Sequence, residues 1–515
     1  MQLSDININD HQALFDAIEY NYPSTKEDRI AIKQIMLNED NPLYIRAMVI
    51  SALTLNLFKY FDTDKFESLY TYTLEDQHIT IRARAWVAIV LVAMKHDVRI
   101  SLDEKIKDQL KFIVDECNES STKKNILFTI QVILYKCIQA AQAAQLIKDT
   151  LGQKIEEGLK VIKNNKEKSE EDQAPAWDNY LNESGIQDQI NDLLDLQRKG
   201  IDITISTFAQ ISKFPFFSVK CNWFLPFSDK HPLIEAIGRK SEKKEMFIKI
   251  MNKSGQMCST EKYSNVLVLT LMPDSQMEQV ESAFKANDIQ IENIATATLE
   301  DEVLNYMHDM YRYYCLFKGA KDDYNPFNRS LYFGNYYGLD SVIKKYDIQV
   351  QLANYLYQSK IYKDAGMIFK EILLADESKE YLQKYAFCLM NDDNRNANVI
   401  LAILSRANTL FPGDKWTLKN ISKYLENINA SQNIIETTLR ESYQYFPDDV
   451  TIINKLASCL MKQEKFSEAL QLLFKSDILK ENSNQTMSMI IDCANYLGKK
   501  DIAENYQNKL NSANE

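Results

Sequence analysis

Residues 352–369, LANYLYQSKIYKDAGMIF, and residues 456–473, LASCLMKQEKFSEALQLL, share one pattern of small and large apolar residues. Each stretch begins with Leu-Ala, has a leucine three residues after that alanine and an aromatic residue nine after it, and then a second alanine. Apolar residues at spacings of three and four are typical of helices. Alanines allow paired helices to approach closely, while larger side chains fill the space between pairs. The two stretches therefore predict stacked helix pairs.

The spacing of this pattern gives the length of a repeat. Ala353 and Ala457 lie 104 residues apart, and Ala469 and Ala503 lie 34 residues apart, which agrees with a period of about 34 residues. In this pattern residues 347–515 strongly resemble the tetratricopeptide repeat (TPR) family, with about four full repeats and a final capping helix pair.

Two features depart from the family pattern. Residues 391–396 insert extra residues in the second repeat, and the first helix of the third repeat, residues 416–424, lacks the usual small residue. We therefore expect the second and third repeats to be distorted.

The TPR resemblance implies a right-handed superhelix whose concave groove is lined by the first helix of each pair and holds a peptide or helix of another protein. Some members clamp a C-terminal carboxylate with lysine–asparagine pairs, but only Asn354 fits that pattern and its basic partners are absent, so we do not predict the clamp. The groove positions that the resemblance implies in this sequence are Asn354, Tyr357, Asn454, Ser458 and Met461.

Residues 1–150 contain a second repeat pattern. An Arg-Ala pair recurs at Arg46 and Arg82, 36 residues apart, each time between a polar turn and an apolar helical run, and a third possible copy starts at residue 121. The pattern resembles HEAT-like repeats, and this resemblance implies that Arg46 and Arg82 support the packing between repeats.

A second interpretation of this arm is that Arg82, Arg84 and Trp86 line a surface that grips phosphates, as in HEAT-like DNA glycosylases. Residues 1–150 carry 17 Lys and Arg against 21 Asp and Glu, and a net negative charge argues against a DNA-binding face. Trp86 lies within an apolar run, so we expect it in the core.

Residues 151–178 include the most charged and least apolar part of the chain, KNNKEKSEEDQAPAW. Such a composition cannot bury enough apolar surface to order itself, so we predict a charged flexible linker. The acidic cluster at residues 170–172 leaves a recognition tail as the alternative. From residue 179 to 346 the helical spacing returns, and this part is predicted to form a helical middle region.

The middle region contains an aromatic stretch, FPFFSVKCNWFLPF, at residues 214–227. Six of its fourteen residues are Phe or Trp, and prolines near both ends break regular helix. Six exposed rings would promote aggregation unless they were covered. We expect an internal clasp that fastens the first arm to the second. The alternative is a partner-binding anchor that includes Trp223 and Phe224, because such residues often dominate interface energies.

The basic segment 239–253 raises the possibility of nucleic-acid binding. Residues 201–262 hold ten Lys and Arg and six Asp and Glu, and basic residues interleaved with aromatics can pair with phosphates and stack on bases. Here the basic segment is separate from the aromatic stretch and alternates with glutamates. The pattern favours an amphipathic helix with a charged outer face.

Composition excludes several protein classes. The chain of 515 residues has a net charge of −12, 12 glycines and 10 prolines, which favours helices with short connections over loop-rich enzymes. Its first residues show no signal-peptide pattern. The longest apolar run, residues 85–94, is half the length of a membrane span. The eight cysteines are scattered singly, as in reduced proteins, so we expect a cytoplasmic location and no membrane insertion.

The sequence shows no catalytic, cofactor-binding or metal-binding motif. We therefore predict an all-α protein, an α-solenoid with a HEAT-like N-terminal arm, an irregular aromatic-rich helical middle and a C-terminal TPR superhelix. The whole arrangement also resembles, more loosely, a bacterial family of TPR-containing proteins, which implies no activity. The predicted function is a non-catalytic scaffold that binds a partner protein or peptide. The alternatives are nucleic-acid association through residues 239–253 and an enzyme whose site is assembled from distant residues.

Overall fold

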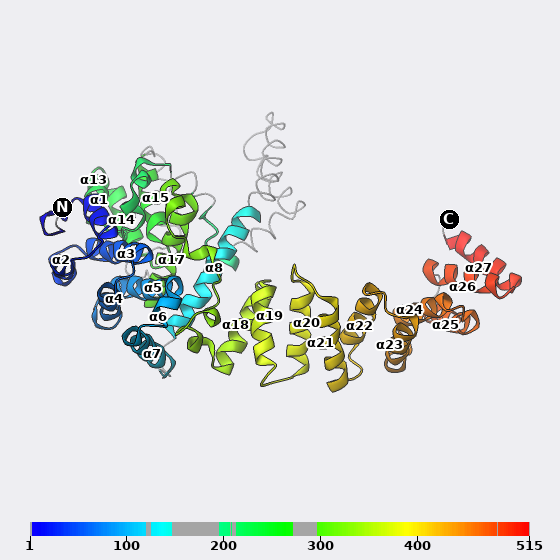
Figure 1. Cartoon of the computed structure of the whole chain (residues 1–515). Coiled ribbons are helices and arrows are strands. Elements are labelled where there is room, and N and C mark those ends of the chain that lie inside the picture. Colours follow the sequence, from blue (N-terminus) through cyan, green and yellow to red (C-terminus); the bar gives the residue numbers. More distant parts are fainter. Residues whose placement is uncertain are drawn as a thin grey trace, which may run out of the picture. The chain divides into compact units, whose positions relative to one another are not determined.

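The computed structural model describes residues 3–119, 125–146, 195–205, 208, 213–270, 296–480 and 483–513. Every regular element in these ranges is a helix, which confirms the all-α prediction (Figure 1). The chain divides into two compact units, Met1–Ile343 and Lys344–Glu515. The linker predicted at residues 151–178 lies outside the described residues.

The first unit begins with helices that alternate between amphipathic and fully buried. The helices α3 and α5 are apolar on nearly all sides and bury almost every residue, so they form the centre of this unit. The other helices of this part cover them. The bounds are α1 His11–Glu19, α2 Lys26–Leu37, α3 Leu43–Lys59, α4 Thr63–Glu75, α5 Ile79–Lys95, α6 Asp97–Ile100, α7 Glu104–Glu119 and α8 Ile126–Leu146.

The later helices of the first unit pack against this core. Its longest helix, α17 (Leu299–Leu316), packs against both α5 and α8. A Thr298–Asp301 capping box begins it, because the Thr298 hydroxyl accepts from the Asp301 backbone N–H and the Asp301 carboxylate accepts from the Thr298 backbone N–H. The remaining α-helices are α13 Pro232–Gly238, α14 Glu242–Lys253 and α15 Ser259–Leu269, and the short 3-10 helices include η3 Pro215–Ser218 and η4 Lys220–Trp223.

The two repeated arginines of the first arm occupy matching places. Arg46 Nε donates to the carbonyl oxygen of Met36 at 2.7 Å, and Arg82 Nε donates to that of Thr73 at 3.2 Å. In each case the acceptor lies near the end of the preceding helix, so the guanidinium holds the two helices of a pair together. These two contacts lie within a helix pair, and the expected role in packing between repeats stays a prediction. Trp86 is buried, as predicted.

The aromatic stretch, residues 214–227, is packed inside the first unit. Trp223 and Phe224 are each 1% exposed. The Phe224 ring stacks on Phe15 of α1 at a centroid distance of 5.5 Å, and Trp223 lies 5.9 Å from Phe317, which follows α17. The Arg84 guanidinium of α5 donates to the Phe224 carbonyl oxygen at 2.6 Å. The stretch thus ties the first arm to the helical middle region. Its predicted link to the repeat array stays a prediction.

A buried charge network reinforces the same junction. Lys220 of η4 contacts Glu19 of α1 at 2.6 Å and Asp323 at 2.8 Å, and Lys59 of α3 contacts both carboxylates as well. The Tyr313 hydroxyl of α17 donates to Asp323. Two cations facing two carboxylates leave the group neutral, which suits a buried position.

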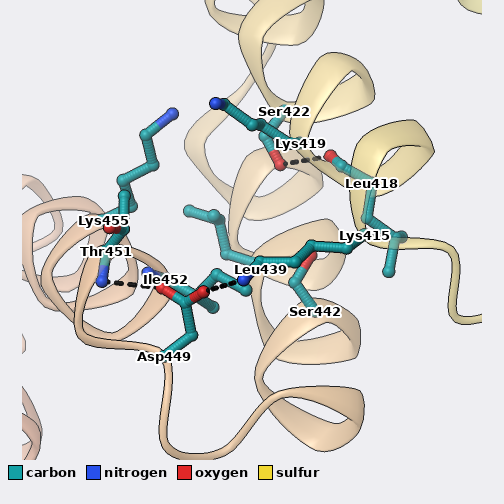
Figure 2. A pocket seen from close by; sticks show the side chains of 10 residues that line it. All are labelled: Lys415, Leu418, Lys419, Ser422, Leu439, Ser442, Asp449, Thr451, Ile452 and Lys455. Atoms are coloured by element: carbon teal, nitrogen blue, oxygen red, sulfur yellow. Dashed lines mark hydrogen bonds and ion pairs between the residues drawn. The ribbon is translucent and has the colours of Figure 1, made fainter.

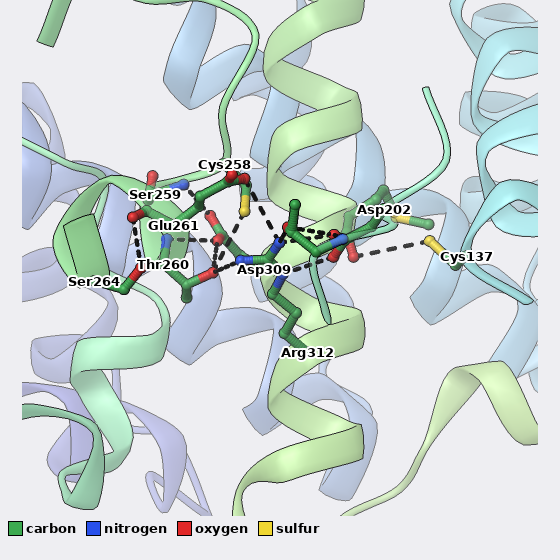
Figure 3. Close-up of polar contacts among 11 residues, drawn as sticks. Cys137, Asp202, Cys258, Ser259, Thr260, Glu261, Ser264, Asp309 and Arg312 are labelled. Atoms are coloured by element: carbon green, nitrogen blue, oxygen red, sulfur yellow. Dashed lines mark hydrogen bonds and ion pairs between the residues drawn. The ribbon is translucent and has the colours of Figure 1, made fainter. Parts of the chain in front are cut away.

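A second buried network holds α17 in place (Figure 3). Arg312 of α17 is fully buried, and its guanidinium donates to both carboxylate oxygens of Asp202, at 2.6 and 2.7 Å. One turn earlier, Asp309 accepts from the backbone N–H groups of Ser259 and Thr260 at 3.1 and 2.8 Å. Asp309 therefore caps α15, and the whole network joins α15, α17 and the segment around Asp202.

The second unit consists of ten helices among its described residues, in which each helix packs on the next (Figure 1). This sequential packing of helix pairs is TPR-like, as predicted. We call the earlier member of each pair the first helix and the later member the second helix. The pairs are α18 Tyr346–Gln358 with α19 Tyr362–Ile372, α20 Lys379–Met390 with α21 Ala397–Leu410, α22 Lys415–Asn427 with α23 Gln432–Tyr445, α24 Val450–Lys462 with α25 Phe466–Leu479, and α26 Asn484–Tyr496 with α27 Lys500–Ala513.

The small residues that the pattern required are buried between these helices. Ala353 and Ala457 are both fully buried. The prediction that the first helix of the third repeat, α22, lacks a small residue was wrong. Ser422 of α22 stands three residues before a leucine, as those alanines do, and is 2% exposed. Its hydroxyl donates to the Leu418 carbonyl at 3.0 Å, which allows a serine to replace alanine at a buried position.

Candidate functional site

Asn354 and Tyr357, two of the predicted groove residues, lie half-buried on α18. The Asn354 side-chain oxygen accepts from the Lys384 ammonium of α20 at 2.6 Å, and the same ammonium lies 5.7 Å from the centroid of the Tyr357 ring. The prediction that Asn354 has no basic partner was therefore wrong. Glu380 pairs with Lys384, so this cation is already neutralised.

Asn454 is not a groove residue in the structure. It is 7% exposed. Its side-chain nitrogen donates to the Thr486 hydroxyl at 3.0 Å, and its side-chain oxygen accepts from the Ser476 hydroxyl at 2.7 Å. Both polar ends are therefore used to join α24, α25 and α26. The predicted partner-binding role is replaced by a structural one, because a buried amide must find its partners inside the fold.

We expect Asn454→Ala to lower the free energy of unfolding of the second unit by about 1–3 kcal/mol, because Thr486 and Ser476 lose a buried partner. Equilibrium urea denaturation checks this. Asn505→Ala makes the same change at an exposed position of α27 and should stay within about 0.5 kcal/mol of the wild type. Equal stabilities for the two variants would contradict the assignment.

The other predicted residues also lie mostly inside the molecule. Ser458 and Met461 of α24 are half-buried, and Met461 packs against the apolar core of the last repeats. Trp223 and Phe224 belong to the interior of the first unit, so their side chains are not available to a partner in this structure. The predicted residues therefore do not form one continuous surface.

A pocket of about 210 Å³ lies between the first helices α22 and α24, with the second helix α23 beneath it (Figure 2). Sequence analysis proposed none of the residues that line it, which are Lys415, Leu418, Lys419, Ser422, Leu439, Ser442, Asp449, Thr451, Ile452 and Lys455.

The floor of this pocket is apolar and electrically neutral. Leu418 and Leu439 are buried beneath it. The hydroxyls of Ser422 and Ser442 donate to backbone carbonyl groups of their own helices, at 3.0 and 2.8 Å. These hydroxyls are therefore satisfied within the protein.

One lysine at the rim is paired. Lys415 forms an ion pair with Asp449, and Asp449 also accepts from the backbone N–H groups of Thr451 and Ile452 at 2.8 and 3.1 Å. Burial acts to raise the pKa of Asp449, but these hydrogen bonds and the Lys415 charge outweigh burial and lower it. Asp449 thus caps α24 as an anion and neutralises Lys415.

The two other lysines at the rim have no counter-charge. Lys419 is exposed and Lys455 is half-buried, and neither forms a hydrogen bond or ion pair within the part of the chain that the structure describes. In Figure 2 both side chains extend to the same side of the pocket, away from Asp449. The pocket therefore offers two positive charges above an apolar floor.

A sequence signal for this site was present. Lys415, Lys419 and Lys423 follow one another at intervals of four, which places them on one face of α22. Like charges at this spacing destabilise a helix slightly. This row of lysines was not predicted as a site, because the TPR pattern is defined by small and large apolar positions and does not include these lysines.

Comparisons with known proteins return structural similarity alone. No protein-family model and no curated protein matches the chain. Among solved structures, the chain is similar to MamA from Desulfovibrio magneticus RS-1, with 12% identity and a TM-score of 0.28, over 33% of this chain and 93% of that one. It is similar to pilF of Pseudomonas aeruginosa, with 16% identity and a TM-score of 0.27, over 34% of this chain and 78% of that one.

A third similarity, to the Cut9–Hcn1 hetero-tetramer of the APC/C, covers 95% of this chain and 90% of that one, with 14% identity and a TM-score of 0.23. The TPR-like description of the second unit rests on its own helix packing. Among the described residues, no helix has the length and apolar character needed to cross a membrane. No cluster of three or more His, Cys, Asp or Glu side chains in the same residues could hold a metal ion.

Proposed function

We propose that the protein is a non-catalytic scaffold that binds a segment of a partner protein on the first-helix face of its second unit. TPR-like folds commonly mediate protein–protein interactions. The observation that supports the proposal is the pocket between α22 and α24, in which Lys419 and Lys455 stand without a counter-charge above an apolar floor. Apolar contact area with a few convergent charged groups is a frequent basis of specific recognition.

The chemistry of the pocket supports binding rather than catalysis. A nucleophilic hydroxyl needs a neighbouring base that takes its proton. Here the Ser422 and Ser442 hydroxyls donate to backbone carbonyls instead. The proposal therefore assigns no reaction to this site.

The proposal includes a cytoplasmic location. Of the seven cysteines whose side chains the structure describes, all except Cys315 are buried. Buried single thiols are typical of proteins kept in a reducing compartment.

The nucleic-acid alternative gains no support from the geometry of the basic segment 239–253. Arg239 pairs with Glu235 and Lys249 pairs with Glu245, both at spacings of four residues. Lys244 is buried. Pairing and burial remove part of the positive charge that phosphate binding needs.

Photo-crosslinking tests the scaffold proposal. A photoreactive amino acid is placed at Thr451, an exposed pocket residue, or at Thr437, an exposed residue of the second helix α23. In native lysate, the Thr451 variant should crosslink to a discrete protein, identified by mass spectrometry, and excess unlabelled full-length protein should suppress the product. That protein, once purified, should bind the full-length chain directly. Equal labelling from both positions, or none from Thr451, would exclude partner binding at this face.

A further inference from the structure

We propose that the pocket between α22 and α24 recognises side-chain carboxylates, those of a glutamate or aspartate in an acidic segment of the partner. This inference rests on the proposed function and names the chemistry of the bound segment. Three features of the pocket support it: the charge of the rim, the size of the pocket and the kinds of residue that line it.

The positive charge at the rim of the pocket favours an anionic ligand. Three lysines and one aspartate line the pocket, and the aspartate neutralises only Lys415. Lys423 extends the same row on α22, is exposed, and forms no hydrogen bond or ion pair with the described residues. Because like charges on one helix face repel each other, an anionic ligand stabilises this arrangement. Such a ligand places its charge between Lys419 on α22 and Lys455 on α24.

The size of the pocket suits one side chain. Its volume of about 210 Å³ is below the range of about 300–1,000 Å³ that is typical of small-molecule sites. The floor is formed by Leu418, Leu439 and Ile452. The methylene groups of a glutamate pack on such a floor while its carboxylate reaches the lysines at the rim, as amphipathic side chains commonly do.

The lining residues favour a carboxylate side chain over other anions. None of the ten lining residues is arginine, although arginine is the residue that bidentate phosphate recognition prefers. None is asparagine or glutamine, so the pocket has no side-chain amide donor to fix the geometry of a bound carboxylate. None is aromatic, so no ring is present for base stacking. Lysines are flexible point charges that suit carboxylates presented in more than one geometry.

Selection from a random peptide library displayed at the N-terminus of a phage coat protein tests the inference. In this format the peptides carry no phosphate and no free C-terminal carboxylate, so acidic side chains are the only anions offered. Peptides selected on the immobilised full-length protein should be enriched in Glu and Asp relative to the unselected library. The enrichment should disappear on the Lys419→Gln/Lys455→Gln double variant.

Lys363→Gln/Lys370→Gln provides the matched control, because it removes two exposed lysines from the second helix α19. This variant should select the same acidic peptides as the wild type. A selected peptide whose glutamate is changed to glutamine should bind the wild type about two- to fivefold more weakly, and should bind the Lys419→Gln/Lys455→Gln variant no differently from its parent.

Three results would overturn the inference. Selected peptides without acidic enrichment would leave the scaffold function standing and remove its carboxylate specificity. The same enrichment on the Lys419→Gln/Lys455→Gln variant would place acid recognition elsewhere. Tighter binding of a phosphoserine peptide than of its glutamate parent would assign the pocket to phosphate. The crosslinking experiment tests the scaffold function separately: if that function is wrong, the photoreactive residue at Thr451 gives no crosslinked protein.

Discussion

Asp202→Asn is expected to lower the free energy of unfolding of the first unit by about 3–5 kcal/mol. Arg312 is fully buried, and Asp202 is its bidentate partner at 2.6 and 2.7 Å. Asparagine keeps the size of the side chain but removes the bidentate counter-charge and leaves the guanidinium with Glu261, at 3.6 Å, as its remaining acidic partner. Breaking a buried ion pair by removing one partner is strongly destabilising because the other charge stays buried without full compensation.

Urea denaturation of the full-length protein, followed by tryptophan fluorescence, measures this loss, since Trp86 and Trp223 are buried in the first unit. Asp195→Asn is the matched control, because Asp195 pairs with Arg198 at an exposed site of the same segment and should cost about 0–1 kcal/mol. Similar losses for the two variants would contradict the prediction.

The pH dependence gives an independent check. Burial acts to raise the pKa of Asp202, but the adjacent Arg312 guanidinium outweighs it and holds the pKa well below its ordinary value. A carboxyl with a lowered folded-state pKa adds stability above its unfolded pKa of about 3.9, and this stability is lost as the pH falls toward the folded value. The stability gap between wild type and Asp202→Asn should therefore be full at neutral pH and narrow below about pH 4.

Local patterns in the sequence predicted the second unit well. Each copy of the pattern of small and large apolar residues, around Ala353 and around Ala457, lies within a single helix pair. Residues close together in the sequence are therefore enough to predict this packing. The first unit depends on contacts between distant residues. Asp202 and Arg312 lie 110 residues apart, and Arg84 and Phe224 lie 140 apart. No periodic pattern in a single sequence identifies such partners.

The candidate site was predicted less well than the fold. The family resemblance assigned Asn454 to the groove by its position in the repeat. In the structure its side-chain amide is buried and forms hydrogen bonds with the hydroxyls of Ser476 and Thr486. Two lysines of the pocket, Lys415 and Lys419, were visible in the sequence as part of a row at intervals of four. These lysines can bind an anion only if no acidic side chain of the protein pairs with them. The sequence does not show this, because it depends on how the neighbouring helices pack.

Trp223→Ala is expected to lower the free energy of unfolding of the first unit by about 3–5 kcal/mol. Trp223 is 1% exposed, lies 5.2 and 5.9 Å from the rings of Phe217 and Phe317, and donates its indole N–H to the Phe217 carbonyl at 2.9 Å. Alanine leaves a large cavity and removes this hydrogen bond. Because the stretch connects α1 with α17, hydrogen exchange should rise in both helices.

Two further variants separate burial from partner binding at this position. Phe112→Ala removes an aromatic ring that is 50% exposed on α7 of the same unit, and its stability should stay within about 0.5 kcal/mol of the wild type. Trp223→Phe keeps most of the ring volume and should lose less than Trp223→Ala. If Trp223 instead anchored a partner, Trp223→Ala would leave stability and hydrogen exchange unchanged and would weaken partner binding. Unchanged stability would therefore show that the clasp is not a determinant of this fold, because the loss of a large ring that is 1% exposed and packs against Phe317 must leave a costly cavity if that packing stabilises the unit.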